Sequence, residues 1–185
     1  APVPAALARL RALAERAAPF VFPVVVFLGA FFVLSRATLR WPGDVDEGFY
    51  AVAGELASHG RMVYRDFFYP QAPLLPYLLG ALVRVVGPSY VAMRLALCAV
   101  GALTAALVAH AARRETRSYI AGITGALFLC THELGWQWLP SIRSYGIASL
   151  AAVAALVLVT DPRKPPSWWR CPRARPRACA SASCN

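Results

Sequence analysis

Residues 17–35 read AAPFVFPVVVFLGAFFVLS, a run of 19 residues without a charged side chain. At about 1.5 Å per residue, a helix of this length extends roughly 28 Å, close to the thickness of the hydrocarbon core of a bilayer. Comparable uncharged runs cover residues 95–112, 118–132 and 144–160. This pattern predicts an all-α, polytopic membrane protein with about four transmembrane helices.

The composition favours the same fold class. The chain has 58% hydrophobic and 15% charged residues, whereas about a quarter of the residues of a soluble domain are charged. The net charge of +10 does not indicate nucleic-acid binding, because the arginines lie mainly at the ends of apolar runs and in the C-terminal tail. Basic residues at such places set topology and contact anionic lipid headgroups. We therefore expect membrane lipids, and no nucleic acid, among the partners.

Basic residues also indicate the orientation of the predicted spans. Arginines precede the first span and lie between the second and third, and Arg163 and Lys164 follow the fourth. Because basic loops prefer the cytoplasmic side, the N-terminus is expected in the cytoplasm of a bacterium, with the chain integral to the inner membrane. Residues 1–17 then form a cytoplasmic amphipathic helix, and the loop after the first span lies outside.

This outer loop is rich in carboxylates and aromatic residues. It reads RWPGDVDEGFY over residues 40–50 and YRDFFYPQAPL over residues 64–74. Apolar residues at helical spacing predict an interfacial helix within 44–59. Three prolines within 67–83 predict an irregular entry followed by a short re-entrant or interfacial helix, and a full span there is the alternative.

Asp44, Asp46 and Glu47 place three carboxylates within four positions. Two of them have a structural explanation, because Asp44 is a favourable N-cap and Glu47, three residues later, has the spacing of a capping box. Asp46 is not required by that motif, and a carboxylate in such a cluster suits proton abstraction. Hard cations also take oxygen ligands, so a divalent cation is a second interpretation. No metal-ligand set is assigned, because no partner ligand is recognised elsewhere.

The order of these features resembles the N-terminal region of GT-C-fold glycosyltransferases, of the protein O-mannosyltransferase-like and aminoarabinose-transferase-like groups. The resemblance covers roughly residues 18–160. It comprises an apolar span, the Asp46–Glu47 pair followed by an aromatic residue, a short helix, the stretch YRDFF, a Pro- and Leu-rich helix, and Arg94-Leu95 near the start of a span. It implies an enzyme that transfers a sugar from a polyprenyl-phosphate donor to an acceptor on the outer membrane face, with inversion.

The resemblance also implies roles for particular residues. Asp46 would remove the proton of the acceptor hydroxyl, with Glu47 in support. Arg65 and Arg94 are candidates for contacts with the lipid phosphate. The predicted substrate-binding set is completed by Asp44, Tyr50 and Asp66.

Most of these residues also have simpler explanations. Arg65 suits a local ion pair with Asp66, and Arg94 suits snorkelling towards lipid headgroups. Tyr50 and the aromatic residues at 67–69 suit an interfacial aromatic belt. A non-enzymatic alternative therefore stays open, a small four-span protein that binds a partner or anionic lipid through its outer loop and basic tail.

The composition changes after residue 160. Residues 161–185 form a basic, low-complexity tail, and the last 19 residues contain no Val, Ile, Leu, Phe or Tyr. Such a segment cannot bury a core, and we interpret it either as a disordered tail or as a translation out of frame. Because the GT-C fold has many more spans, the resemblance implies that residues 18–160 are a partial domain. We expect the fragment to be inactive alone, since half a pocket cannot hold donor and acceptor in attack geometry.

Overall fold

The computed structural model describes the backbone of residues 5–160 and the side chains of residues 18–160. The predicted tail at 161–185 lies outside the described residues. Within residues 5–160 the chain forms helices and no β-strand, so the all-α prediction is confirmed. The helices are α1 (Ala5–Arg40), α2 (Val45–Ser58), α3 (Leu74–Val86), α4 (Tyr90–Thr116), α5 (Tyr119–Thr131), α6 (Glu133–Trp138) and α7 (Tyr145–Val159).

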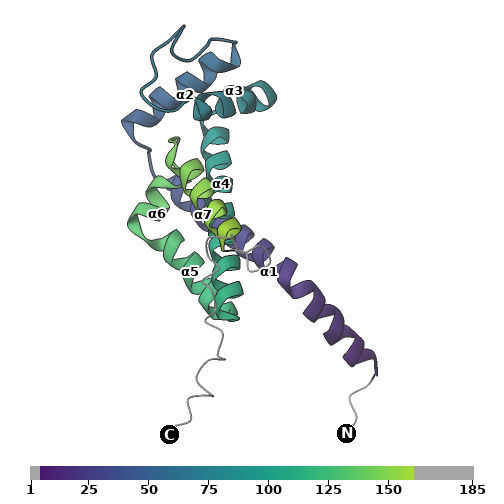
Figure 1. Cartoon of the computed structure of the whole chain (residues 1–185). Helices are drawn as coiled ribbons and strands as arrows, with labels where there is room; N and C mark the ends of the chain where they lie inside the picture. Colours follow the sequence, from purple (N-terminus) through teal and green to yellow (C-terminus); the bar gives the residue numbers. More distant parts are fainter. Residues whose placement is uncertain (1–4, 161–185) are drawn as a thin grey trace, which may run out of the picture.

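The first helix is longer than expected. One continuous helix runs from Ala5 to Arg40, so residues 5–17 are helical and join the first predicted span without a break. Pro19 and Pro23 lie inside α1, where each removes a backbone donor and favours a bend. Figure 1 shows the N-terminal part of α1 diverging from the other helices.

Two helices have the length and composition needed to cross a membrane, at Ala18–Arg40 and Tyr90–Thr116. They contain the predicted first and second spans. The helices at the predicted third and fourth spans, α5 and α7, have 13 and 15 residues, fewer than the roughly 20 of a typical span. Each helix is one residue shorter at each end than the predicted run, because Ser118 and His132 cap α5 and Ser144 and Thr160 cap α7.

The fourth helix is central to the fold. It packs against α1, α5 and α7, as Figure 1 shows. Small side chains permit the close approach, because Ala102, Ala105 and Ala109 of α4 are fully buried against α1 and α5. Small side chains at a helix interface let the two backbones approach closely.

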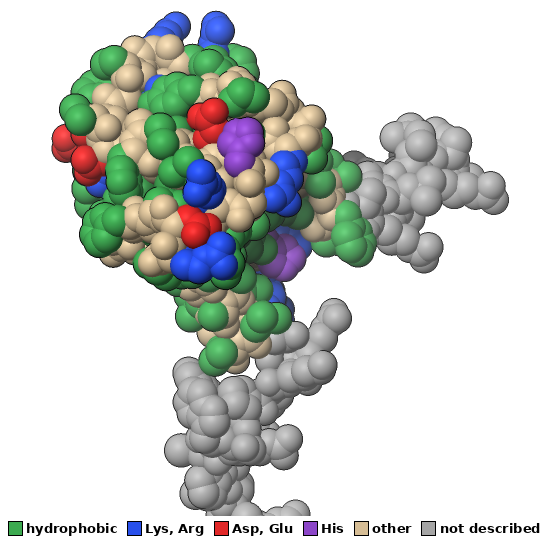
Figure 2. All heavy atoms as spheres, turned by 90° about the horizontal axis from the view of Figure 1, so that it is seen from above, with side chains coloured by type: hydrophobic (Ala, Val, Ile, Leu, Met, Phe, Trp, Pro, Cys, Tyr) green, Lys and Arg blue, Asp and Glu red, His purple; other side chains and the backbone are tan. Residues whose placement is uncertain are grey.

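The segment 45–86, which we call the α2–α3 cap, lies across one end of these helices (Figure 1). Its two helices were expected within 44–59 and after an irregular entry in 67–83, and both are present, with Pro76 in the first turn of α3. They touch at glycines: a Cβ at Gly54 would lie 2.6 Å from Leu79 Cβ, and one at Gly80 would lie 3.0 Å from the Ser58 amide nitrogen. Figure 2, seen from the cap end, shows mostly hydrophobic side chains with scattered charged groups.

Candidate functional site

The site begins at the turn between α1 and α2. Gly43 has φ +88°, a conformation that favours glycine, and a Cβ there would lie 2.6 Å from the Tyr90 hydroxyl. This turn brings the start of α2 against the start of α4. Glu47, in the first turn of α2, therefore faces α4 rather than solvent.

Glu47 is buried in a network with α4. Its carboxylate forms an ion pair with Arg94, with 3.3 Å between Oε2 and Nε, and accepts a hydrogen bond of 2.5 Å from the Tyr90 hydroxyl. Arg94 also donates to the Trp41 carbonyl at 2.8 Å. Glu47 and Arg94 are 2% and 7% exposed, so each depends on the other for compensation of its buried charge.

The expected capping box is absent. Asp44 occupies the N-cap position of α2 but its side chain makes no capping hydrogen bond. Asp44 instead contacts Arg143, and Glu47 turns to Arg94. Hydrogen bonds between two charged groups are stronger than those to a neutral backbone N–H, which explains why the arginines outcompete the helix end.

Arg143, just before α7, joins two of the loop carboxylates. It contacts Asp44 and donates a 2.8 Å hydrogen bond to Asp46 Oδ2. Its guanidinium lies 4.8 Å from the centroid of the Trp138 ring. Burial lowers the pKa of the Arg143 guanidinium, but interactions with Tyr145 and the two aspartates raise it by more, so Arg143 stays charged.

These residues surround a cavity of about 200 Å³. It is lined by indole, carboxylate, amide, hydroxyl and guanidinium groups, including those of Trp41, Asp44, Glu47, Gln137, Trp138 and Arg143. Asp46 contacts Arg143 beside this cavity, and the side chain of Asp46 is 61% exposed. Asp46 does not itself line the cavity, but Arg143, which does, holds its carboxylate at the edge.

Arg94 and Tyr50 support the site rather than line it. Arg94 is occupied by Glu47 and the Trp41 carbonyl, so it positions Glu47. Tyr50 is buried, and its hydroxyl accepts a 2.9 Å hydrogen bond from Gln71. Ser144 donates to Gln71 at 2.8 Å, which links the α2–α3 cap to the start of α7.

Arg65 and Asp66 lie in a separate place. They form a bidentate pair with each other, at 2.9 and 3.2 Å, and Asp66 also accepts from the Met62 amide at 2.7 Å. The hydrogen bond from Arg65, followed by that from Met62, holds the pKa of Asp66 below its usual range. Among the described side chains, neither residue contacts Asp44, Asp46 or Glu47, so the structure does not bring this pair into the cavity.

The resemblance left Arg143 available in the loop after the third predicted span but aligned no family residue with it, although one signal was present. Arg143 is the only charged residue between Glu133 and Asp161, and an isolated charge in an apolar region needs a partner. Tyr90, Gln71 and Trp138 carry no comparable signal. Within residues 18–160, no group of three or more His, Cys, Asp or Glu side chains is arranged to hold a metal ion.

No protein-family model, no curated protein and no solved structure matches this chain. The function is therefore argued from the site and from the arrangement of the helices around it.

Proposed function

We propose that this chain forms the acceptor-activating end of a membrane glycosyltransferase that uses a polyprenyl-phosphate-linked sugar. The observation that carries the proposal is the meeting of Asp44 and Asp46 with Arg143, about a hundred positions further along the chain, beside a cavity that Glu47 also lines. Of the three, Asp46 is the most exposed and remains available to a ligand.

The membrane placement is part of the proposal. Helices α1 and α4 supply two spans, and α5 and α7 supply two more together with the turns that flank them. Strongly exposed apolar side chains on the two shorter helices, such as Phe128 at 68% and Leu158 at 74%, support contact with lipid. With the N-terminus in the cytoplasm of a bacterial cell, the cavity and the α2–α3 cap lie at the outer face of the inner membrane.

In the proposed reaction, Asp46 takes the proton of the acceptor hydroxyl while its oxygen forms a bond to the anomeric carbon of the sugar. The bond from that carbon to the phosphate oxygen breaks, and the lipid phosphate leaves with the electron pair, which gives inversion. Arg143 orients Asp46. Arg94 and Tyr90 fix Glu47, which holds the turn that carries Asp46. No step requires a metal ion, and a divalent cation beside the departing phosphate is an optional addition.

Because this chain is expected to be inactive alone, the test uses membranes that contain it together with the remaining spans of the transferase, supplied in turn with radiolabelled polyprenyl-phosphate sugars. We expect Asp46→Asn to lower sugar transfer by roughly 10²–10⁴-fold, the usual contribution of a general base. A photoreactive polyprenyl phosphate should still label the variant. Asp66→Asn, which removes a carboxylate outside the cavity, is the matched control and should leave transfer unchanged. Labelling without any transfer to an acceptor, or transfer that survives Asp46→Asn, would overturn the proposal.

The same ion pairs also favour a second candidate, a non-enzymatic membrane protein that binds a partner or anionic lipid. In it, Glu47–Arg94 and Asp44–Arg143 act only as ties between the outer loop and the helices. This candidate predicts no donor labelling, and it predicts that Asp46→Asn changes stability slightly and nothing else.

A further inference from the structure

A second hollow lies towards the opposite end of the helices from the cavity, between α1 and α4. Its volume is about 360 Å³ and its lining is almost entirely apolar. The lining includes Pro23, Val24 and Phe27 of α1 and Leu103, Leu107 and His110 of α4. We call it the α1–α4 groove.

The groove is open to the outside of the helical bundle. Val24 and Leu103 on its walls are 56% and 43% exposed. Pro23, which interrupts the backbone hydrogen bonds of α1, lies on one wall, and α1 diverges from α4 beyond it (Figure 1). An open apolar groove on the lipid-facing side of a membrane protein suits a hydrocarbon chain, because only apolar contacts are required there.

Basic residues continue the wall of the groove along α4. Leu103, Leu107 and His110 follow helical spacing, and Arg113 and Arg114 come three and four residues after His110, on the same side of the helix. With Arg117 and against Glu115, this end carries two positive charges in excess. A ligand that lies in the groove with its polar end towards the end of α4 therefore contacts positively charged side chains.

The two arginines are placed to receive an anion. The Arg113 guanidinium lies between the rings of Phe22 and Tyr119, at 5.7 and 5.1 Å from their centroids. Its Nη1 donates to the Tyr119 hydroxyl at 3.2 Å, while its Nε is buried without a hydrogen-bond partner among the described residues. Arg114 donates to the Thr160 hydroxyl at 2.8 Å, beside the end of α7. Its Nε and Nη2 also lie 3.2 Å from Oε1 of the exposed Glu115, so a phosphate shares this guanidinium with a carboxylate.

We propose that the α1–α4 groove binds one anionic phospholipid, with an acyl chain along the groove and the phosphate at Arg113 and Arg114. Charge complementarity selects this occupant, since phosphate oxygens form charge-assisted hydrogen bonds with guanidinium groups. In the proposed orientation this end faces the cytoplasmic leaflet, whose anionic lipids attract basic residues next to a span. The proposal rests on the membrane placement and is independent of sugar transfer.

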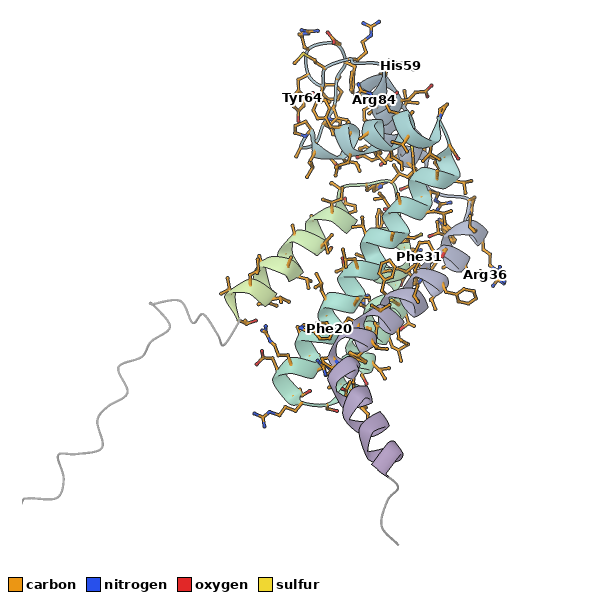
Figure 3. All side chains as sticks on the ribbon, turned by 90° about the vertical axis from the view of Figure 1, so that its right-hand side faces the viewer. Phe20, Phe31, Arg36, His59, Tyr64 and Arg84 are labelled. Carbon is orange, nitrogen blue, oxygen red and sulfur yellow. The ribbon has the colours of Figure 1, made fainter. Side chains whose placement is uncertain are left out.

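Native mass spectrometry of the full chain in detergent tests the proposal, with phosphatidylglycerol and phosphatidylcholine of identical acyl chains as the probes. We expect one phosphatidylglycerol to bind in preference to phosphatidylcholine. The double change Arg113→Gln and Arg114→Gln should weaken phosphatidylglycerol binding about tenfold to thirtyfold. Arg36→Gln with Arg40→Gln removes the same charge at the cap end of α1, where Figure 3 labels Arg36, and should leave binding unchanged.

A second pair of variants tests the acyl chain. Val24→Trp should block the groove and weaken binding of the lipid, whereas Val25→Trp should not, because Val25 is equally exposed at 59% but does not line the groove. Glycerol phosphate, which lacks the chain, should fail to displace the lipid. Equal binding of the two lipids, an unaffected arginine double variant, or displacement by glycerol phosphate would each overturn the proposal.

Discussion

Two arginine–carboxylate pairs in the predicted outer region of this chain differ in almost every physical respect. Arg94 and Glu47 are 47 positions apart, and their side chains are 9% and 3% exposed. Arg65 and Asp66 are neighbours in the sequence, and their side chains are 68% and 18% exposed. An ion pair between sequence neighbours compensates only the two charges that form it. The pair between Arg94 and Glu47 also joins α4 to α2, and so fixes the turn that carries Asp46.

The largest expected effect comes from breaking the buried pair. Glu47→Ala leaves the Arg94 guanidinium without compensation at a buried position, which should lower the free energy of unfolding by about 3–5 kcal/mol. Thermal unfolding of the detergent-solubilised protein measures this. Glu47→Gln keeps an acceptor for the Tyr90 hydroxyl and should lose less. The contrast between the pairs is refuted if Glu47→Ala costs no more than Asp66→Ala.

A packing variant separates the effect of charge pairing from that of helix contact, because it loosens the α2–α3 cap without removing a charge. A Cβ at Gly80 would lie 3.0–3.1 Å from backbone atoms of α2, so Gly80→Val should force α2 and α3 apart at a cost of about 1–3 kcal/mol. Limited proteolysis should then cut between residues 59 and 73 faster than in the unchanged chain. If the cap does not loosen, α2 and α3 are not held by this contact.

Breaking the link to α7 should have a smaller effect on stability. Arg143→Ala releases Asp44 and Asp46, which are 47% and 61% exposed in their side chains and are readily hydrated, so the cost should be about 1 kcal/mol. Arg143→Lys keeps the charge but not the planar guanidinium, and tests its geometry. Sugar transfer should fall in both variants, more in Arg143→Ala. A loss of stability equal to that of Glu47→Ala would show that the two arginines have equivalent roles.

The exposed pair should show the smallest effect, visible only in acid. Arg65 and the Met62 amide lower the pKa of Asp66. The stabilisation that the ionised Asp66 gives to the folded chain is therefore fully present above the ordinary aspartate pKa of 3.8. It is lost as the pH falls through the lower pKa of the folded chain. Hydrogen exchange at the Met62 amide, corrected for intrinsic rates, should quicken there. Asp66→Asn should show the faster rate at neutral pH, and an unchanged rate would contradict the assignment.

The sequence predicted the helices well where apolar periodicity was long. The runs that contain α1 and α4 and the spacing in 44–59 all correspond to helices. The runs 118–132 and 144–160 also correspond to helices, because their end residues are the caps of α5 and α7. Orientation, location and the transferase reading stay predictions.

The site was harder to predict, for a physical reason. A local motif led to the capping box, whereas the choice of Arg65 came from the family resemblance. The simpler explanation of Arg65, an ion pair with its neighbour Asp66, is confirmed. The observed partners of the loop carboxylates are Arg94 in α4 and Arg143 just before α7. Such pairs, between residues far apart in sequence, form only through tertiary packing. The carboxylates themselves were identified from sequence, whereas the pairing of two of them with Arg143 and the contact of Glu47 with Tyr90 follow only from the folded chain.

The position of Arg143 in the chain has a consequence for biosynthesis. A chain emerges from the ribosome N-terminus first, so the loop with Asp44 and Asp46 is made well before Arg143. Glu47 can meet Arg94 when α4 is complete at Thr116, while the two aspartates wait until Arg143, 27 residues later. The half-made protein therefore holds a hydrated, unpaired acidic turn, and the site matures only when the last described helix arrives.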